Sequence, residues 1–201
     1  MAHTVMPPIL LAFADEVPHC WMDLRQMGIP EQVSAIKSGE IDIGLSRPPI
    51  LDPMMHVEKL LKEPFVAAIP TNNPLARKKT LSVKTLVNAP FIIPPSGALH
   101  DLIIESCRNA GFEPRVIQEA AELQTILGLV SAGLGISLVP SSSRRVQMPN
   151  VIYKPLVNSP MAETVLVWKA DSQSPLLLSF VKVAKGTART LHRMQQVGRS
   201  L

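Results

Sequence analysis

The stretch from Glu119 to Pro140, EAAELQTILGLVSAGLGISLVP, constrains the fold more than any other part of the chain. Apolar residues recur at helical spacing over Leu123–Val130, which predicts a helix with one buried face. Gly133 follows, where a left-handed residue would end that helix. Ile136–Val139 is a short apolar run closed by proline, which favours a buried strand. A helix, a glycine turn and a buried strand form half of a βαβ unit, and sheets of such units bind ligands at their strand ends.

The rest of the chain alternates helix-spaced and strand-spaced segments, so the sequence predicts an α/β fold. The expected helices cover residues 7–17, 31–37, 82–86, 98–110 and 175–194. The expected strands cover residues 21–26, 41–46, 57–61, 64–69, 91–93, 115–118, 136–139, 151–156 and 164–169.

A break at Pro70–Pro74 (PTNNP) indicates a crossing into a second structural unit. A return crossing near Thr164–Lys169 would bring the last helix back to the first unit. We therefore expect two Rossmann-like lobes of about 100 residues each, formed by residues 1–69 with 169–201 and by residues 70–168. Clefts between such lobes are common sites for small molecules.

Composition argues against several functional classes. Only 4% of the residues are aromatic, which disfavours a stacking platform for nucleic acid. Cys20 and Cys107 lack the spacing of a zinc site or a disulfide framework, which predicts no metal and fits a reducing compartment. No apolar run reaches the length of a membrane span, so we expect no membrane partner.

Catalytic signals are weak. His100 and Asp101 lie close in sequence to Ser96, but a GxSxG elbow is absent and adjacent helical residues point apart. Gly133-Leu134-Gly135 lacks a third glycine and precedes a strand, so a dinucleotide site is not supported. We therefore expect no enzyme activity and no cofactor.

Anion recognition is better supported. Ser96 and Gly97 lie at a predicted helix N-terminus, where free N–H groups favour a carboxylate, although Ser96 could simply cap the helix. Arg47 follows a buried strand, where side chains face a cleft, with a surface salt bridge as the alternative. Glu122 opens a helix beside the same predicted cleft and could instead complement the helix dipole.

The net charge of +4 is concentrated near the C-terminal end, where no acid follows Asp171. This basic segment is either the solvated face of a last helix or a surface close to an acidic partner such as DNA. Its cations are Lys182, Lys185, Arg189, Arg193 and Arg199.

Three segments, in the correct order, resemble the regulatory half of LysR-type transcriptional regulators. They are QVSAIKSGEIDIGLSRPP (residues 32–49), EPFVAAIPTNNPLA (residues 63–76) and LGLVSAGLGISLVPSS (residues 127–142). The amino-acid sequence around Glu122 and Arg47 is most similar to that of the family members that govern breakdown of benzoate, catechol and chlorocatechol. The resemblance implies two lobes of the periplasmic-binding-protein type (type II), joined by two crossover strands, with an effector in the cleft.

The resemblance also implies which residues bind the effector, which partners the protein has and where in the cell it is located. Ile29, Arg47, Glu122 and the run Pro95–Gly97 (Pro95, Ser96 and Gly97) match effector-pocket positions, and Ile29 replaces a threonine hydroxyl of close relatives. The implied partners are a small organic acid and a homo-oligomer, a dimer or, when full-length, a tetramer. DNA and RNA polymerase would be partners only through the full-length protein, and the implied location is cytoplasmic.

The start of the chain departs from the family pattern. Met1–Pro7 aligns just after the family's helix-turn-helix, linker helix and first regulatory strand, so we expect no specific DNA binding by this chain alone and a gap or an unpaired sheet edge. That gap would need a contact from another chain or would leave a poorly ordered first lobe. A second interpretation starts from Ala12-Phe13-Ala14, which imitates a signal-peptide cleavage site and would indicate an exported solute-binding protein of the same fold, although no positive residue precedes it.

Overall fold

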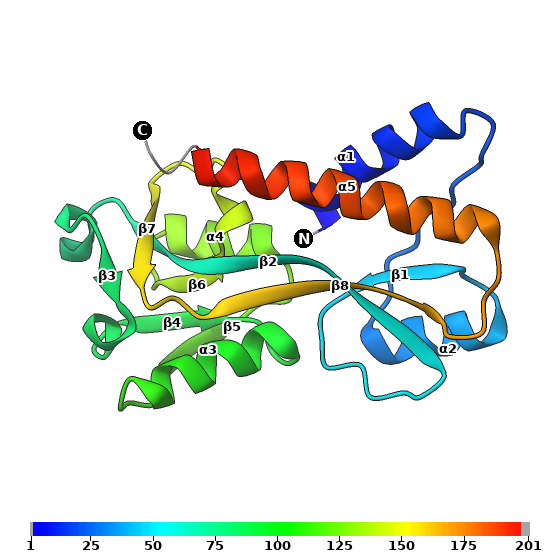
Figure 1. Cartoon of the computed structure of the whole chain (residues 1–201). Helices are drawn as coiled ribbons and strands as arrows, with labels where there is room; N and C mark the ends of the chain where they lie inside the picture. Colours follow the sequence, from blue (N-terminus) through cyan, green and yellow to red (C-terminus); the bar gives the residue numbers. More distant parts are fainter. Residues whose placement is uncertain (1, 198–201) are drawn as a thin grey trace. The chain divides into compact units, whose positions relative to one another are not determined.

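The computed structural model describes the backbone of residues 2–197 and the side chains of residues 5–191, coloured along the chain in Figure 1. Its α-helices are α1 (Ala2–Glu16), α2 (Ile29–Ser38), α3 (Ala98–Asn109), α4 (Leu123–Ser131) and α5 (Pro175–Val197). Its strands are β1 (Ile43–Ser46), β2 (Met55–Pro70), β3 (Leu81–Ser82), β4 (Pro90–Ile93), β5 (Arg115–Glu119), β6 (Ser137–Pro140), β7 (Val151–Val157) and β8 (Met161–Lys169). Short 3-10 helices are η1 (Pro74–Arg77), η2 (Val83–Leu86) and η3 (Ser141–Arg145).

The chain folds into two compact units. Unit 1 comprises residues 1–62 and 163–201, and unit 2 comprises residues 63–162. The long strands β2 and β8 carry the chain from one unit to the other and back. The limits expected from the sequence, 69/70 and 168/169, fall within these same two strands.

In unit 1, strand β8 separates two apolar layers. Leu166 and Trp168 point to one face of the sheet, where they pack with residues of α1 and α5. Val165 and Val167 point to the other face and pack with α2. Strand β1 pairs antiparallel with β8 and is the end strand of the sheet order among residues 2–197. The alternation along β8 is the period of two that a strand buried on both faces requires.

In unit 2, strand β6 joins two different pairing modes. It pairs antiparallel with β2, and a parallel bridge between Ile136 and Phe91 connects it to β4, which pairs parallel with β5. Ile103 and Cys107 of α3 pack on one side of this sheet. Leu127 of α4 packs on the other side. The predicted α/β class is confirmed, and the half βαβ unit lies in a mixed sheet rather than in a purely parallel one.

The two glycines before β6 have different structural roles. Gly133 adopts φ +82° just after Ala132, the C-cap of α4, and this is the left-handed helix end that the sequence predicted. Gly135 allows a close approach, because a Cβ atom there would lie 2.6 Å from the carbonyl oxygen of Pro90. Glycine at position 135 therefore lets the chain enter the sheet beside β4.

One predicted strand is wrong. Residues 20–28, which include the expected strand 21–26, adopt no regular secondary structure. Trp21 is 90% exposed and Leu24 is 61% exposed, so neither side chain is buried against a sheet. A strand is stable only when its backbone groups pair with a neighbour and one of its faces is buried.

Two other predicted boundaries also differ. Helix α1 begins at Ala2, and Pro7 and Pro8 lie inside it rather than at its start. Its packing on α5, with the rings of Phe13 and Phe180 5.1 Å apart, compensates for the backbone hydrogen bonds that the prolines cannot make. The two strands expected at 57–61 and 64–69 form the single strand β2, which runs without a break from Met55 to Pro70.

Candidate functional site

In unit 1, Arg47 follows β1 directly and is half-buried. Its Nη1 donates a 3.3 Å hydrogen bond to the backbone carbonyl of Glu163 at the start of β8. The nearby carboxylate of Glu163 lies 3.4 Å from Lys62 Nζ and 3.7 Å from Lys59 Nζ. The guanidinium is therefore anchored by backbone, in a region where cations outnumber the carboxylate.

Helix α2 brings Ile29 toward the same end of unit 1. A Cβ atom at Gly44 would lie 2.5 Å from the side chain of Gln32, so the helix rests directly on β1. Ile29 precedes Gln32 by almost one turn, and Arg47 follows Gly44 by three residues, so both lie beyond the same end of the helix–strand pair. Ile29 is half-buried and places an apolar side chain there.

In unit 2, two helix N-termini lie at one edge of the sheet. The backbone N–H of Ala120, just after β5, donates a 3.0 Å hydrogen bond to the carbonyl of Ile93, the last residue of β4. Helix α3 starts five residues after Ile93, and α4 starts three residues after Ala120. Both starts lie beyond the carboxyl ends of parallel strands, the usual position of ligands in α/β sheets.

The turn before α3 contains Pro95, Ser96 and Gly97, all exposed. Gly97 is the N-cap at φ +91°, and no side chain caps the helix. The alternative role of Ser96, as the cap of this helix, is therefore wrong. The first N–H groups of α3 have no partner within the helix and are available to an anion.

Glu122 is the N-cap of α4, and its exposed carboxylate makes no capping hydrogen bond. An acid at this position complements the positive end of the helix dipole. The structure thus brings Pro95, Ser96, Gly97 and Glu122 to one edge of unit 2, and Ile29 and Arg47 to one end of unit 1.

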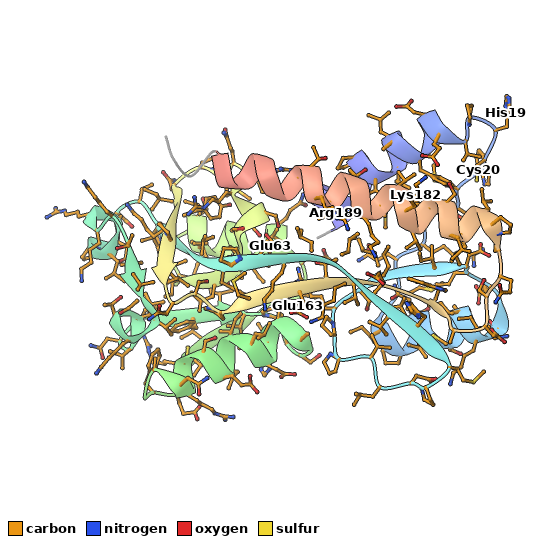
Figure 2. The ribbon with its side chains drawn as sticks, in the orientation of Figure 1. His19, Cys20, Glu63, Glu163, Lys182 and Arg189 are labelled. Carbon is orange, nitrogen blue, oxygen red and sulfur yellow. The ribbon has the colours of Figure 1, made fainter. Side chains whose placement is uncertain are left out.

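A buried polar cluster in unit 2 was missed by the sequence analysis. Glu63 is 1% exposed and is the acid that opens the segment EPFVAAIP (Figure 2). Its carboxylate accepts hydrogen bonds from the Ser142 amide (2.6 Å), the Ser142 hydroxyl (3.0 Å) and the Ser141 hydroxyl (3.2 Å). A charged residue before a proline in an apolar strand was the signal that could have identified it.

No group of three or more His, Cys, Asp or Glu side chains within the described part of the chain could hold a metal ion. Among the helices described, none combines the length and apolarity needed to cross a membrane.

The comparison with known families decides the classification. The family described as LysR substrate binding domain matches residues 1–189. The chain belongs to this family. The HTH-type transcriptional regulator AlsR of Bacillus subtilis is 32% identical over 183 residues, covering 89% of this chain and 61% of the relative. BenM of Acinetobacter baylyi, also an HTH-type transcriptional regulator, is 33% identical over 159 residues, covering 77% of this chain and 52% of BenM.

Solved structures of LysR-type proteins share the fold. The effector binding domain of a BenM variant has a TM-score of 0.86 and 27% identity, with 94% of this chain and 90% of that chain covered. The BenM effector binding domain with its effector benzoate has a TM-score of 0.83 and 27% identity, with 96% and 87% covered. This LysR-type chain therefore has the effector-binding-domain fold, which favours a regulator over an exported solute-binding protein. The chain spans about three fifths of the length of curated relatives such as AlsR.

Proposed function

We propose that this chain is the effector-sensing and oligomerising part of a LysR-type regulator and that its effector is a small organic acid, derived from an aromatic compound. The observation that carries the proposal is the hydrogen bond between Ala120 and Ile93, because it fixes the N-termini of α3 and α4 at one sheet edge. The unpaired N–H groups at such ends, with the helix dipoles, attract a carboxylate.

Arg47 supplies the second kind of recognition. Its anchoring on the Glu163 carbonyl limits the conformations of a long side chain, so less entropy is lost when it binds a carboxylate. In this proposal Arg47 binds an acid group in unit 1, where Ile29 offers an apolar contact, and the Ser96–Gly97 turn offers anion-binding N–H groups in unit 2. Glu122, also exposed, would accept a hydrogen bond from a protonated or hydroxyl group of the ligand.

The benzoate-bound BenM domain supports the ligand class, since benzoate is an aromatic acid and that domain shares this fold. The isoleucine at position 29 favours an acid without a hydroxyl group near that point. Switching requires that the acid bind one arrangement of the protein better than another. DNA binding, contact with RNA polymerase and tetramer formation are proposed for the whole regulator.

Thermal unfolding with added acids tests the proposal. Benzoate and cis,cis-muconate, each supplied at about 100 times its Kd, should stabilise the chain by about 2.7 kcal/mol, and acetate should have less effect. Arg47→Ala should remove most of this stabilisation. Isothermal titration of the same variant separates lost binding from lost fold stability.

Arg77→Ala is the matched control, because Arg77 is an exposed arginine of η1 and lies outside the proposed residues. It should bind the acids as tightly as the unaltered chain. Equal stabilisation of Arg47→Ala and the unaltered chain would exclude Arg47 from the site. The absence of stabilisation by any aromatic or dicarboxylic acid would reject the proposed ligand class.

A further inference from the structure

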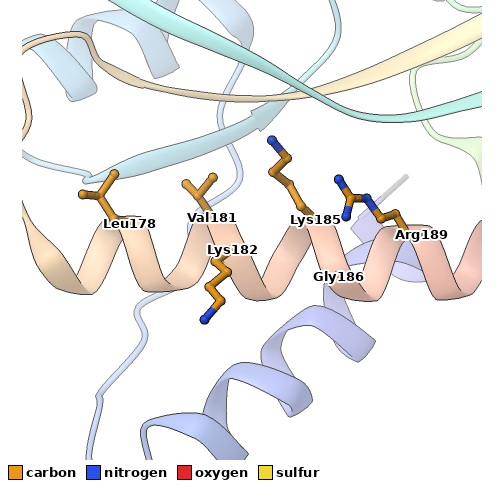
Figure 3. Close-up of a pocket in the computed structure, with 6 residues that line it drawn as sticks. All are labelled: Leu178, Val181, Lys182, Lys185, Gly186 and Arg189. Carbon is orange, nitrogen blue, oxygen red and sulfur yellow. The ribbon is translucent and has the colours of Figure 1, made fainter.

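Helix α5 carries a cavity of about 330 Å³ in unit 1, and none of the residues assigned above lines it. Figure 3 shows its lining along three turns of the helix, with Lys182 directed to the opposite side from Lys185 and Arg189. The six described residues that line it are Leu178, Val181, Lys182, Lys185, Gly186 and Arg189. The groove thus has cations along both sides, an apolar end and a glycine between them.

Gly186 has no evident packing role. A Cβ atom there would meet nothing within 4 Å, and its φ is not in the left-handed region. Glycine in a helix interior is less stable than alanine, so this position keeps open space at a cost in helix stability. Positions 182 and 189 are the helix neighbours of residue 186 at four residues before and three residues after, so their side chains flank that space.

The charges around the space are unbalanced. Lys185 Nζ lies 2.7 Å from the carboxylate of Glu58, which His56 also approaches at 3.8 Å. Within residues 5–191, neither Lys182 nor Arg189 has an ion-pair partner. Lys182, Lys185 and Arg189 thus carry three positive charges, of which the Glu58 carboxylate offsets one at Lys185, and the remaining charge suits a dianion. Glu58 would repel an anion placed against it. We therefore expect the ligand's negative charges to lie over Gly186, in the space that Lys182 and Arg189 flank.

The apolar end indicates a ligand with a carbon skeleton. Leu178 is 50% exposed and Val181 borders the core of unit 1 at 9% exposure. Arg189 presents a planar fork that matches a carboxylate, and Lys182 presents a point charge on the other side. We propose that this groove is a second anion site of the chain, which takes a small dicarboxylic acid with its carbon chain against Leu178.

Nuclear magnetic resonance of the ¹⁵N-labelled chain tests the site directly through the backbone amide of Gly186, which Gly186→Ala identifies by its loss. Succinate should shift this amide in a saturable way at constant ionic strength. Butyrate, with one carboxylate, should bind about three- to fivefold more weakly, the size of one exposed ion pair. Inorganic phosphate should also bind more weakly, because it has no carbon chain to place against Leu178.

Arg189→Gln and Lys182→Gln should each weaken succinate binding by about three- to fivefold, whereas Lys182→Arg should retain it. Lys84→Gln, at an exposed lysine of η2 in unit 2, should bind normally. Gly186→Ala should raise the Tm while removing binding, measured at neighbouring amides, so loss of fold cannot explain the result. Arg47→Ala should leave this binding intact, which distinguishes the groove from the site proposed above.

Three outcomes would overturn the proposal. Linear shifts without saturation would mean a general salt effect. Equal binding of phosphate, succinate and butyrate would reject the dicarboxylate. Unchanged binding in Gly186→Ala would place the acid elsewhere on the chain.

Discussion

The backbone N–H of Ser142 donates a 2.6 Å hydrogen bond to the buried carboxylate of Glu63, and the Ser142 hydroxyl donates a second one at 3.0 Å. These two residues are 79 positions apart, and their contact ties η3 to the beginning of unit 2. The serine hydroxyls and the amide satisfy a charge that water cannot reach, which is what a buried carboxylate requires.

Replacing Glu63 should therefore destabilise the chain strongly. Glu63→Ala leaves the Ser142 donors buried without an acceptor and should cost about 2–4 kcal/mol, and Glu63→Gln, which keeps one acceptor, about half as much. Urea unfolding measures both. Glu119→Ala, at an exposed position of β5, should stay within about 0.5 kcal/mol of the unaltered chain. A loss no larger than this control would show that the cluster contributes no stability.

Gly135 should not tolerate a side chain. Gly135→Ala places a Cβ atom 2.6 Å from the Pro90 carbonyl oxygen, which is backbone and cannot move without disturbing β4. We expect a loss of about 1–3 kcal/mol, measured as a lower urea midpoint. Gly128→Ala, inside α4 with nothing within 4 Å of its Cβ position, should instead gain about 0.4–1 kcal/mol. Equal effects of the two substitutions would contradict the close approach at β4.

The ion pair of Glu58 and Lys185 predicts a pH dependence. The hydrogen bond from Lys185 holds the pKa of Glu58 below its ordinary value of 4.5. Because the folded pKa is lowered, the stabilisation is complete above about pH 4.5 and is lost as pH falls through the folded pKa. Lys185→Met should cost about 0.5–1 kcal/mol at pH 7 for this partly exposed pair.

The difference in unfolding free energy between Lys185→Met and the unaltered chain should shrink when urea unfolding is repeated below pH 4. Methionine keeps most of the aliphatic stem, so lost packing contributes little. Lys84→Met, where the lysine is exposed, should show no such trend. A difference that stays constant from pH 7 to pH 3 would mean that the ion pair is not its source.

The two cysteines should differ in reactivity. Burial raises the pKa of the Cys107 thiol to about 12, because desolvation disfavours the thiolate. Cys20 is half-exposed in the segment between α1 and α2 (Figure 2). At pH 8 iodoacetamide should therefore modify Cys20 and leave Cys107 unmodified until denaturant is added, as mass spectrometry of the peptides would show. Rapid modification of Cys107 in the folded chain would contradict its burial.

Local patterns in the sequence were enough for the α/β class and for the family. The helix over Leu123–Ser131, its end at Gly133 and the strand after it follow from apolar spacing and from the left-handed preference of glycine. Such signals depend on neighbours within a few residues, so a single sequence carries them. For the same reason, the sequence alone could place Arg47 at the end of a strand and Ser96–Gly97 at the start of a helix.

The tertiary structure decided the features that depend on distant partners. Residues 21–26 have strand-like composition, yet a strand needs a neighbour, and Trp21 remains exposed. Strand β6 could have been placed in a parallel sheet by its motif, but its antiparallel partner β2 lies about 70 residues away. The burial of Glu63 and the open space above Gly186 likewise depend on what other segments place nearby, and no local pattern contains that information.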